Sequence, residues 1–274
     1  MKETSRARGV RGRLSALLGM TLLGGSLLSG SSGAARALEW GSVHDPATCA
    51  RPALWVVSDA DTTIYLFGTI HAHDGRAHWF DHAVRVAFDA SDELVLETVV
   101  PTVPVTLAAP DAGGLAAARS TIKTARALGM SVQLGADQVL HRAAKAGGKS
   151  VVGLEDFAAQ IAMYQSLTPA KVDVPMPASP PDPAVAPFLR SMVDSWNRGD
   201  SRPIEAVVGA VQIQSPDSYR RLFSDRNTLW AKWIGTRLRQ PGTVFVAVGT
   251  GHLVGRESVQ ARLALTGIRS ARVN

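Results

Sequence analysis

Two short segments far apart in this chain share the pattern Gly-x-x-His. Gly68-Thr69-Ile70-His71 follows the apolar run 64–67, and Gly249-Thr250-Gly251-His252 follows the apolar run 244–248. Imidazole binds borderline divalent metals and relays protons near neutral pH. Glycine lets the backbone turn sharply or approach a ligand closely. The two histidines are therefore the first candidates for chemistry.

The runs that precede these histidines are typical of strands buried on both faces of a parallel sheet. In open α/β sheets, ligands bind outside the carboxyl ends of the strands. Each histidine stands where a strand is expected to end. We therefore expect His71 and His252 to meet at one site.

Two glutamates stand at the ends of two further strand candidates. Glu97 lies in the run 93–99, and Glu155 follows the run 150–154. Each residue alone has an ordinary structural explanation, such as a hydrogen-bonded histidine or an acid in the first turn of a helix. Four imidazole and carboxylate groups at one sheet edge favour a catalytic or metal-binding function instead.

Arg226 is a fifth candidate, because it lies within the apolar stripe of a helix expected over residues 217–239. An unpaired buried charge costs several kcal/mol, so a buried Arg226 needs a carboxylate. We expect that partner to be Glu97 or Glu155. The alternative is an arginine whose stem covers Trp230 while its head group reaches water.

The remaining segments alternate between strand-like and helix-like patterns, with a mostly helical middle over about 119–240. This predicts an α/β fold, with α+β as the alternative: a central mixed, largely parallel sheet flanked by helices, with a helical insertion. Strands are expected at 55–58, 64–70, 93–99, 150–154, 243–248 and 270–273. Helices are expected at 80–88, 119–128, 137–146, 156–166, 185–197, 203–213, 217–239 and 257–265.

The first 37 residues have the pattern of a secretory signal peptide: a basic start, a short apolar core and small residues before Ala37. We expect cleavage near Ala37 and a periplasmic or secreted protein of residues 38–274. No later run is long enough to cross a bilayer. Residues 168–187 hold seven of the fifteen prolines and predict an irregular loop.

Charge and cysteine content exclude some classes of protein. The net charge of +6 falls to +1 when the six basic residues and one acidic residue of 1–37 are removed. No Lys/Arg stripe with interleaved aromatics remains, so a nucleic-acid partner is not expected. The single cysteine, Cys49, cannot form an internal disulfide.

Seven motifs follow one another along the chain: 52–55, 65–71, 93–97, 152–155, Trp196 with 199–200, 225–227 and 248–255. Together they resemble the TraB/GumN family, relatives of the Tiki proteases. The resemblance implies an α/β fold with a helical insertion and a metal-dependent hydrolase site made from both Gly-x-x-His histidines and a glutamate. His71, Glu97 and His252 match that set, Arg226 matches a recurrent site arginine, and Glu155 and Asp137 match recurring positions.

The leading hypothesis is a secreted metal-dependent hydrolase acting on a peptide or protein. His71 and His252 would hold a divalent ion, with Zn²⁺, Mn²⁺ and Co²⁺ equally suited. Glu97 would ligate the ion or act as a base, and Arg226 would stabilise developing negative charge.

Three alternatives stay open. His71-Ala72-His73 could be the His-x-His of an amidohydrolase, with His78 and His82 as further ligands. The fold could instead serve a non-enzymatic periplasmic binding or regulatory protein. A hydrolase without metal, with a histidine as general base, is the third alternative.

Overall fold

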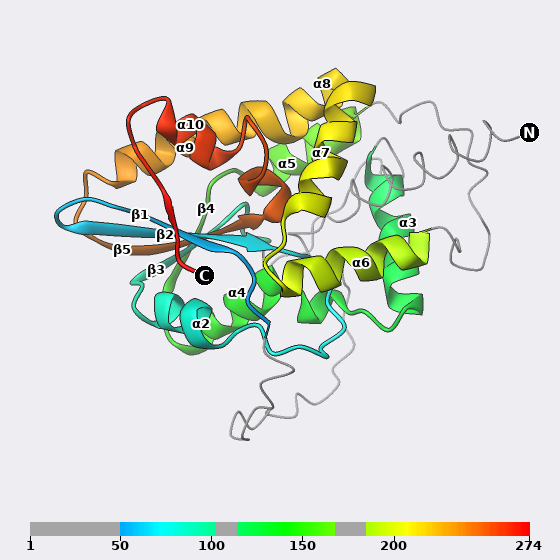
Figure 1. Cartoon of the computed structure of the whole chain (residues 1–274), viewed down its shortest axis with the longest axis horizontal. Coiled ribbons are helices and arrows are strands. Elements are labelled where there is room, and N and C mark those ends of the chain that lie inside the picture. The colour runs from blue at the N-terminus through cyan, green and yellow to red at the C-terminus, as the bar shows by residue number, and fades with distance from the viewer. Residues whose placement is uncertain (1–49, 102–113, 168–184) are drawn as a thin grey trace, which may run out of the picture.

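The chain folds around a six-stranded sheet in the order β4-β3-β5-β2-β1-β6 (Figure 1). The computed structural model describes residues 50–101, 114–167 and 185–274. Strands β4, β3, β5 and β2 are parallel, whereas β1 and β6 continue the sheet in antiparallel pairing. This confirms the predicted mixed, largely parallel sheet. The strands are β1 Leu54–Ser58, β2 Thr62–Thr69, β3 Glu93–Leu96, β4 Ser150–Gly153, β5 Gly242–Gly249 and β6 Ala271–Arg272.

The apolar runs become central strands because both of their faces are covered. In β2, Ile64 and Leu66 point to one apolar core and Phe67 to the other. All three side chains are fully buried. In β5, Val244 and Phe245 divide between the same two cores. Side chains that alternate between two helical layers explain why the central residues of these strands are largely apolar.

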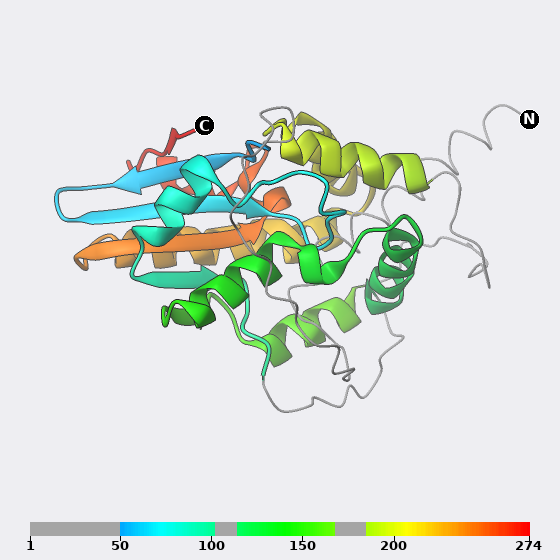
Figure 2. The same ribbon diagram turned by 90° about the horizontal axis from the view of Figure 1, so that it is seen from below.

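Helices cover both faces of the sheet (Figures 1 and 2). α9 (Asp225–Arg237) and α10 (Val259–Ala264) cover one face, and α2 (His82–Asp89) and α4 (Ala136–Ala146) cover the other. The remaining helices gather near the end at which the parallel strands terminate. They are α3 (Gly114–Ala127), α5 (Phe157–Ser166), α6 (Val185–Asn197) and α7 (Arg202–Gln214).

The long helix predicted over 217–239 is interrupted. It consists of α8 (Pro216–Tyr219), a π-helical turn at Arg220–Ser224, and α9. A π turn adds a residue to the helical repeat, which an apolar stripe alone does not reveal, and such turns are frequent at functional sites. Arg226 is the second residue after this turn.

Three boundaries differ from the sequence prediction. Strand β3 ends at Leu96, so Glu97 lies just beyond the strand. α3 begins at Gly114, within a segment expected to be irregular. The proline-rich loop is expected to reach 187, but α6 spans Val185–Asn197 as predicted, so Pro187 belongs to its first turn, where the missing N–H costs no helical hydrogen bond.

Some predictions fall on residues that the structure does not describe. The signal peptide at 1–37, Cys49 and residues 168–184 of the proline-rich loop lie outside the described ranges. Within those ranges, no helix combines the length and the apolar character needed to cross a membrane.

Candidate functional site

The four predicted strand-end residues come from four neighbouring parallel strands. His71 lies two residues after β2, Glu97 directly after β3, and Glu155 two residues after β4. His252 lies in a 3-10 turn, Thr250–Leu253, directly after β5. The carboxyl ends of parallel strands share one sheet edge. We call these four residues, together with Arg226, the polar cluster.

The two Gly-x-x-His segments lie side by side, because Thr69 of β2 is in register with Gly249 of β5. We call residues 68–71 the first corner and residues 249–252 the second corner. A Cβ on Gly68 would lie 2.8 Å from the Thr250 hydroxyl oxygen and 3.2 Å from the Thr250 Cα. The Thr250 hydroxyl also donates to the Thr69 carbonyl at 3.0 Å. Glycine at position 68 therefore permits the close packing of the two corners.

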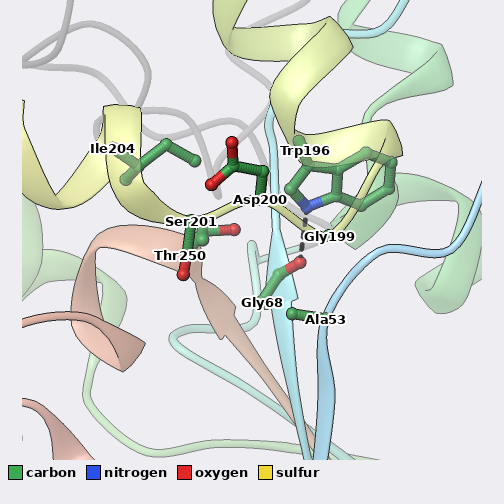
Figure 3. A pocket seen from close by; sticks show the side chains of 8 residues that line it. All are labelled: Ala53, Gly68, Trp196, Gly199, Asp200, Ser201, Ile204 and Thr250. Carbon is green, nitrogen blue, oxygen red and sulfur yellow. Dashed lines mark hydrogen bonds between the residues drawn. The ribbon is translucent and has the colours of Figure 1, made fainter. Parts of the chain in front are cut away.

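A small hollow adjoins the corners (Figure 3). Gly68, Thr250 and Trp196 contribute to its lining. The Trp196 indole N–H donates to the Gly68 carbonyl at 2.8 Å, which braces the first corner. None of the five residues of the polar cluster lines this hollow. The candidate chemistry therefore lies elsewhere, in the buried cluster.

His71 is buried and backed by a carboxylate. Its Nδ1 donates to Asp137 Oδ1 at 3.1 Å, and Asp137 stands in the first turn of α4. Although burial alone would lower it, the pKa of His71 is raised, because the Asp137 carboxylate favours the charged ring. Nε2 of His71 is buried and has no hydrogen-bond partner within the described part of the chain. A buried polar atom of this kind calls for a ligand.

Glu97 is held as an anion. Its Oε1 accepts from the Gly249 backbone N–H at 2.7 Å, and its Oε2 accepts from Arg226 Nη2 at 2.6 Å. Burial works against the charged form, but the Arg226 guanidinium outweighs it. The pKa of Glu97 falls to about 2. A buried carboxylate with this pKa stays ionised at every physiological pH.

Arg226 connects the members of the cluster. Its Nε donates to Glu155 Oε1 at 2.8 Å, and its Nη2 donates to both Glu155 and Glu97. The expected buried ion pair is present, and it includes both candidate carboxylates. Only 5% of Arg226 is exposed, so the snorkelling alternative is wrong. The guanidinium also stacks over Trp230, with Cζ 4.6 Å from the ring centroid.

His252 faces different neighbours. Its Nδ1 lies 2.6 Å from Asn227 Oδ1, and its Nε2 lies 3.0 Å from Arg226 Nη1 and 3.7 Å from Glu97 Oε1. The ring is fully buried against Trp230, with centroids 4.4 Å apart. Burial, followed by the positive charge of Arg226, lowers the pKa of His252 to about 3. His252 is therefore neutral at physiological pH.

Glu155 is the cluster's most exposed side chain, at 22%, compared with 6% or less for Arg226 and Glu97. Its partial burial raises its pKa, against the opposing effect of Arg226. The two glutamates thus share one guanidinium but differ in proton affinity. Paired carboxylates of this kind are typical of acid–base sites.

Helix α5 supplies residues that the sequence analysis missed. Gln160 Nε2 donates to Glu97 Oε2 at 3.3 Å, and Tyr164 is fully buried beside Arg226, which influences its pKa. Burial raises the pKa of this phenol, so it remains protonated. Gln160 and Tyr164 are four residues apart, so they share one face of the helix. That spacing was the available signal.

The His-x-His alternative is not supported at His73. Its Nδ1 accepts from the Gly75 N–H at 2.9 Å, and its Nε2 lies 3.1 Å from Asn197 Oδ1. With Nδ1 as acceptor, Nε2 carries the proton and donates, so neither nitrogen has a free lone pair. His82, a further proposed ligand, has a side chain 73% exposed at the start of α2.

Three side chains of the polar cluster lie close to Gly249. A Cβ on that glycine would lie 3.1 Å from Glu97 Oε1, 3.7 Å from His252 Cδ2 and 3.9 Å from His71 Nε2. Two imidazoles and a carboxylate suit Zn²⁺, Mn²⁺ or Co²⁺, and the Asp137–His71 pair is a common outer-shell arrangement. These residues therefore suit a divalent ion in type.

One hydrogen bond competes with the binding of an ion. Arg226 Nη1 donates to the same His252 Nε2 lone pair that an ion would use. Among the described residues, no three His, Cys, Asp or Glu side chains already converge as a metal-ligand set. Binding of an ion by His252 would therefore require exchange of its Arg226 contact.

Comparison with known proteins gives one match. The model of the TraB/PrgY/gumN family matches residues 53–114 and 110–272, which include every member of the polar cluster. No curated protein and no solved structure matched the chain.

Proposed function

Because the chain belongs to the TraB/PrgY/gumN family, we propose that its polar cluster is the centre of a metal-dependent hydrolase. The observation that carries this proposal is His71 Nε2, a buried nitrogen without a partner in the described residues, beside Glu97 and His252. Peptide bonds are the proposed substrate class, in line with the resemblance to the Tiki proteases. We propose both the use of a metal ion and the class of substrate.

His71, Glu97 and His252 would hold the divalent ion. Bound there, the ion would act as a Lewis acid and lower the pKa of a coordinated water. Asp137 orients His71 and increases its basicity through the Nδ1 hydrogen bond. The Gly249 N–H and Arg226 hold Glu97 ionised in one orientation. These contacts fix the site before any substrate arrives.

Arg226 acts primarily as an organiser in this arrangement. Its N–H groups already bind Glu97, Glu155, His252 and the Leu222 carbonyl. Stabilisation of negative charge on a substrate would require it to release one of them. Glu155 is the partly exposed carboxylate of the cluster, so a substrate is expected to approach from its side.

A second candidate is a hydrolase without metal, in which His71 is the general base. The contact between Arg226 and His252 favours it, because the guanidinium already provides a cation at His252 and Glu97. The raised pKa of His71 suits proton transfer, as does its Nε2, which is buried and has no partner among the residues that the structure describes.

Metal analysis of the purified protein separates these candidates. Wild type should bind about one Zn²⁺ or Mn²⁺ per chain, and His71→Asn should lose it. His73→Asn is the matched control, since His73 is equally buried but engaged by Gly75 and Asn197. Cleavage of a peptide library should then depend on the ion. Cleavage that persists in chelator would support the metal-free candidate, and metal binding without cleavage would support a binding protein.

We also propose export to the periplasm or the exterior, on the basis of residues 1–37. N-terminal sequencing of exported protein should begin at Leu38 or a few residues away. A cytoplasmic protein that retains Met1 would contradict this proposal.

A further inference from the structure

Asn227 lies behind the second histidine and makes two buried hydrogen bonds. Its Oδ1 lies 2.6 Å from His252 Nδ1, and its Nδ2 donates to the Glu257 carbonyl at 2.7 Å. Only 1% of Asn227 is exposed. The Glu257 carbonyl can only accept, so it fixes which end of the amide is the NH₂ group. The oxygen of Asn227 must therefore face His252.

The other side of the ring gives the same assignment independently. Arg226 Nη1 lies 3.0 Å from His252 Nε2, and a guanidinium can donate but not accept. Nε2 is therefore the unprotonated nitrogen, and Nδ1 carries the proton that Asn227 accepts. The order of donors and acceptors from Arg226 through His252 and Asn227 to Glu257 is consistent at every link.

We infer that Asn227 is a positioning residue that locks His252 as the Nδ1–H tautomer, with the Nε2 lone pair directed into the polar cluster. The inference deepens the proposed function, because an ion or a proton at His252 needs that lone pair. Only the catalytic consequence of the tautomer rests on the proposed function. The tautomer itself can be observed whether or not the protein binds a metal or cleaves a substrate.

Nitrogen-15 NMR of the histidine side chains in the full chain provides the direct test. In wild type, His252 Nδ1 should give the signal of a protonated ring nitrogen and Nε2 that of an unprotonated one, with His252→Asn used for assignment. A protonated Nε2 in wild type would overturn the inference.

Variants at position 227 test whether Asn227 provides the lock. Asn227→Leu is similar in size but removes the acceptor, so the His252 Nδ1 signal should shift and an Nε2–H population should appear, limited by the Arg226 donor that remains at Nε2. The affinity for Zn²⁺ should fall about 10–100-fold, the range for loss of an outer-shell partner. Asn227→Asp keeps an oxygen opposite Nδ1, so it should restore the wild-type tautomer and most of the affinity.

A second His–Asn pair in the same protein provides the control. Asn197 Oδ1 accepts from His73 Nε2 at 3.1 Å, outside the polar cluster. Asn197→Leu should change the His73 signals and leave His252 and the Zn²⁺ affinity unchanged. Unchanged His252 signals in Asn227→Leu would show that Asn227 does not set the tautomer. If that variant does not fold, the Asn227→Asp spectrum decides, and loss of the Nδ1–H form there would overturn the inference.

Discussion

The two corners have the same sequence pattern and the same place at the end of a parallel strand, but they hold histidines of opposite character. His71 is backed by the Asp137 carboxylate, which raises its pKa. His252 is backed by the neutral Asn227 amide and faces the Arg226 cation, and its pKa falls to about 3. The motif therefore sets the position of each ring, whereas the residues behind the ring set its charge.

The largest expected effect comes from removing Arg226, the cation that contacts His252 of the second corner. Arg226→Met should lower the free energy of unfolding by about 3–5 kcal/mol, because it leaves Glu97 buried without its partner. Urea unfolding followed by circular dichroism would measure this loss.

Arg220 provides the control on the same helical segment. Its side chain is 55% exposed and pairs with Asp225 at 3.0 Å. Arg220→Met should cost less than about 1 kcal/mol, the range for an exposed ion pair. Equal losses of unfolding free energy in Arg226→Met and Arg220→Met would show that the buried ion pair contributes no more to stability than the exposed one.

Changing the residue behind the first histidine should make that corner resemble the second. Asp137→Asn replaces the carboxylate with an amide, so the pKa of His71 should fall, as an NMR titration would show. Affinity for a divalent ion should fall about 10–100-fold. Asp74→Asn, beside His73, is the control and should change neither the pKa of His71 nor the affinity for the ion. A His71 pKa that is unaffected by Asp137→Asn would mean that the carboxylate is not its cause.

Alanine variants of Gly68 and Gly249 should distinguish an effect on the packing of the corners from an effect on ion binding. Gly68→Ala forces a Cβ to within 2.8 Å of the Thr250 hydroxyl and should cost about 1–3 kcal/mol of stability. Gly249 has φ −52° and ψ 135°, which alanine accepts, so Gly249→Ala should cost less stability than Gly68→Ala. Its Cβ would face Glu97 and His71 and should weaken ion binding. A larger loss of stability in Gly249→Ala, or weaker ion binding in Gly68→Ala alone, would contradict these separate roles.

The smallest expected effects are opposite dependences of stability on pH. His252 is harder to protonate in the folded state, so its contribution to stability is complete above pH 6.5 and is lost as the pH falls towards 3. His71 is easier to protonate in the folded state, so its contribution is complete below pH 6.5 and is lost as the pH rises through its raised pKa.

Histidine-to-asparagine variants reveal these two trends. The stability difference between wild type and His252→Asn should shrink as the pH falls from 6.5 to 4.5, by at most about 1.4 kcal/mol per pH unit. The difference for His71→Asn should shrink as the pH rises above 6.5. Urea unfolding above pH 4.5 avoids the range in which Glu97 begins to titrate. Parallel trends for the two variants would contradict the contrast between the corners.

Sequence patterns identified the histidines, carboxylates and arginine of the site but not its amide and phenol side chains. Arg226 stood out because a charge within an apolar stripe requires a partner, although the sequence did not indicate that it would bind both glutamates. Gln160 and Tyr164 share only the four-residue spacing of one helix face, and Asn227 is one polar residue among several on its helix, so none of the three stood out as a site residue. The π turn was missed because one inserted residue leaves an apolar stripe almost unchanged.

The sequence by itself determined where the reactive groups would lie. Apolar runs form buried strands, and the residues that follow parallel strands must share one edge, so His71, Glu97, Glu155 and His252 could be placed from local pattern alone. Only the tertiary structure decided which histidine is basic and which is neutral. Asp137 lies 66 residues from His71, and Arg226 lies 26 residues from His252. A pKa depends on charges and burial through space, and sequence order does not contain those distances.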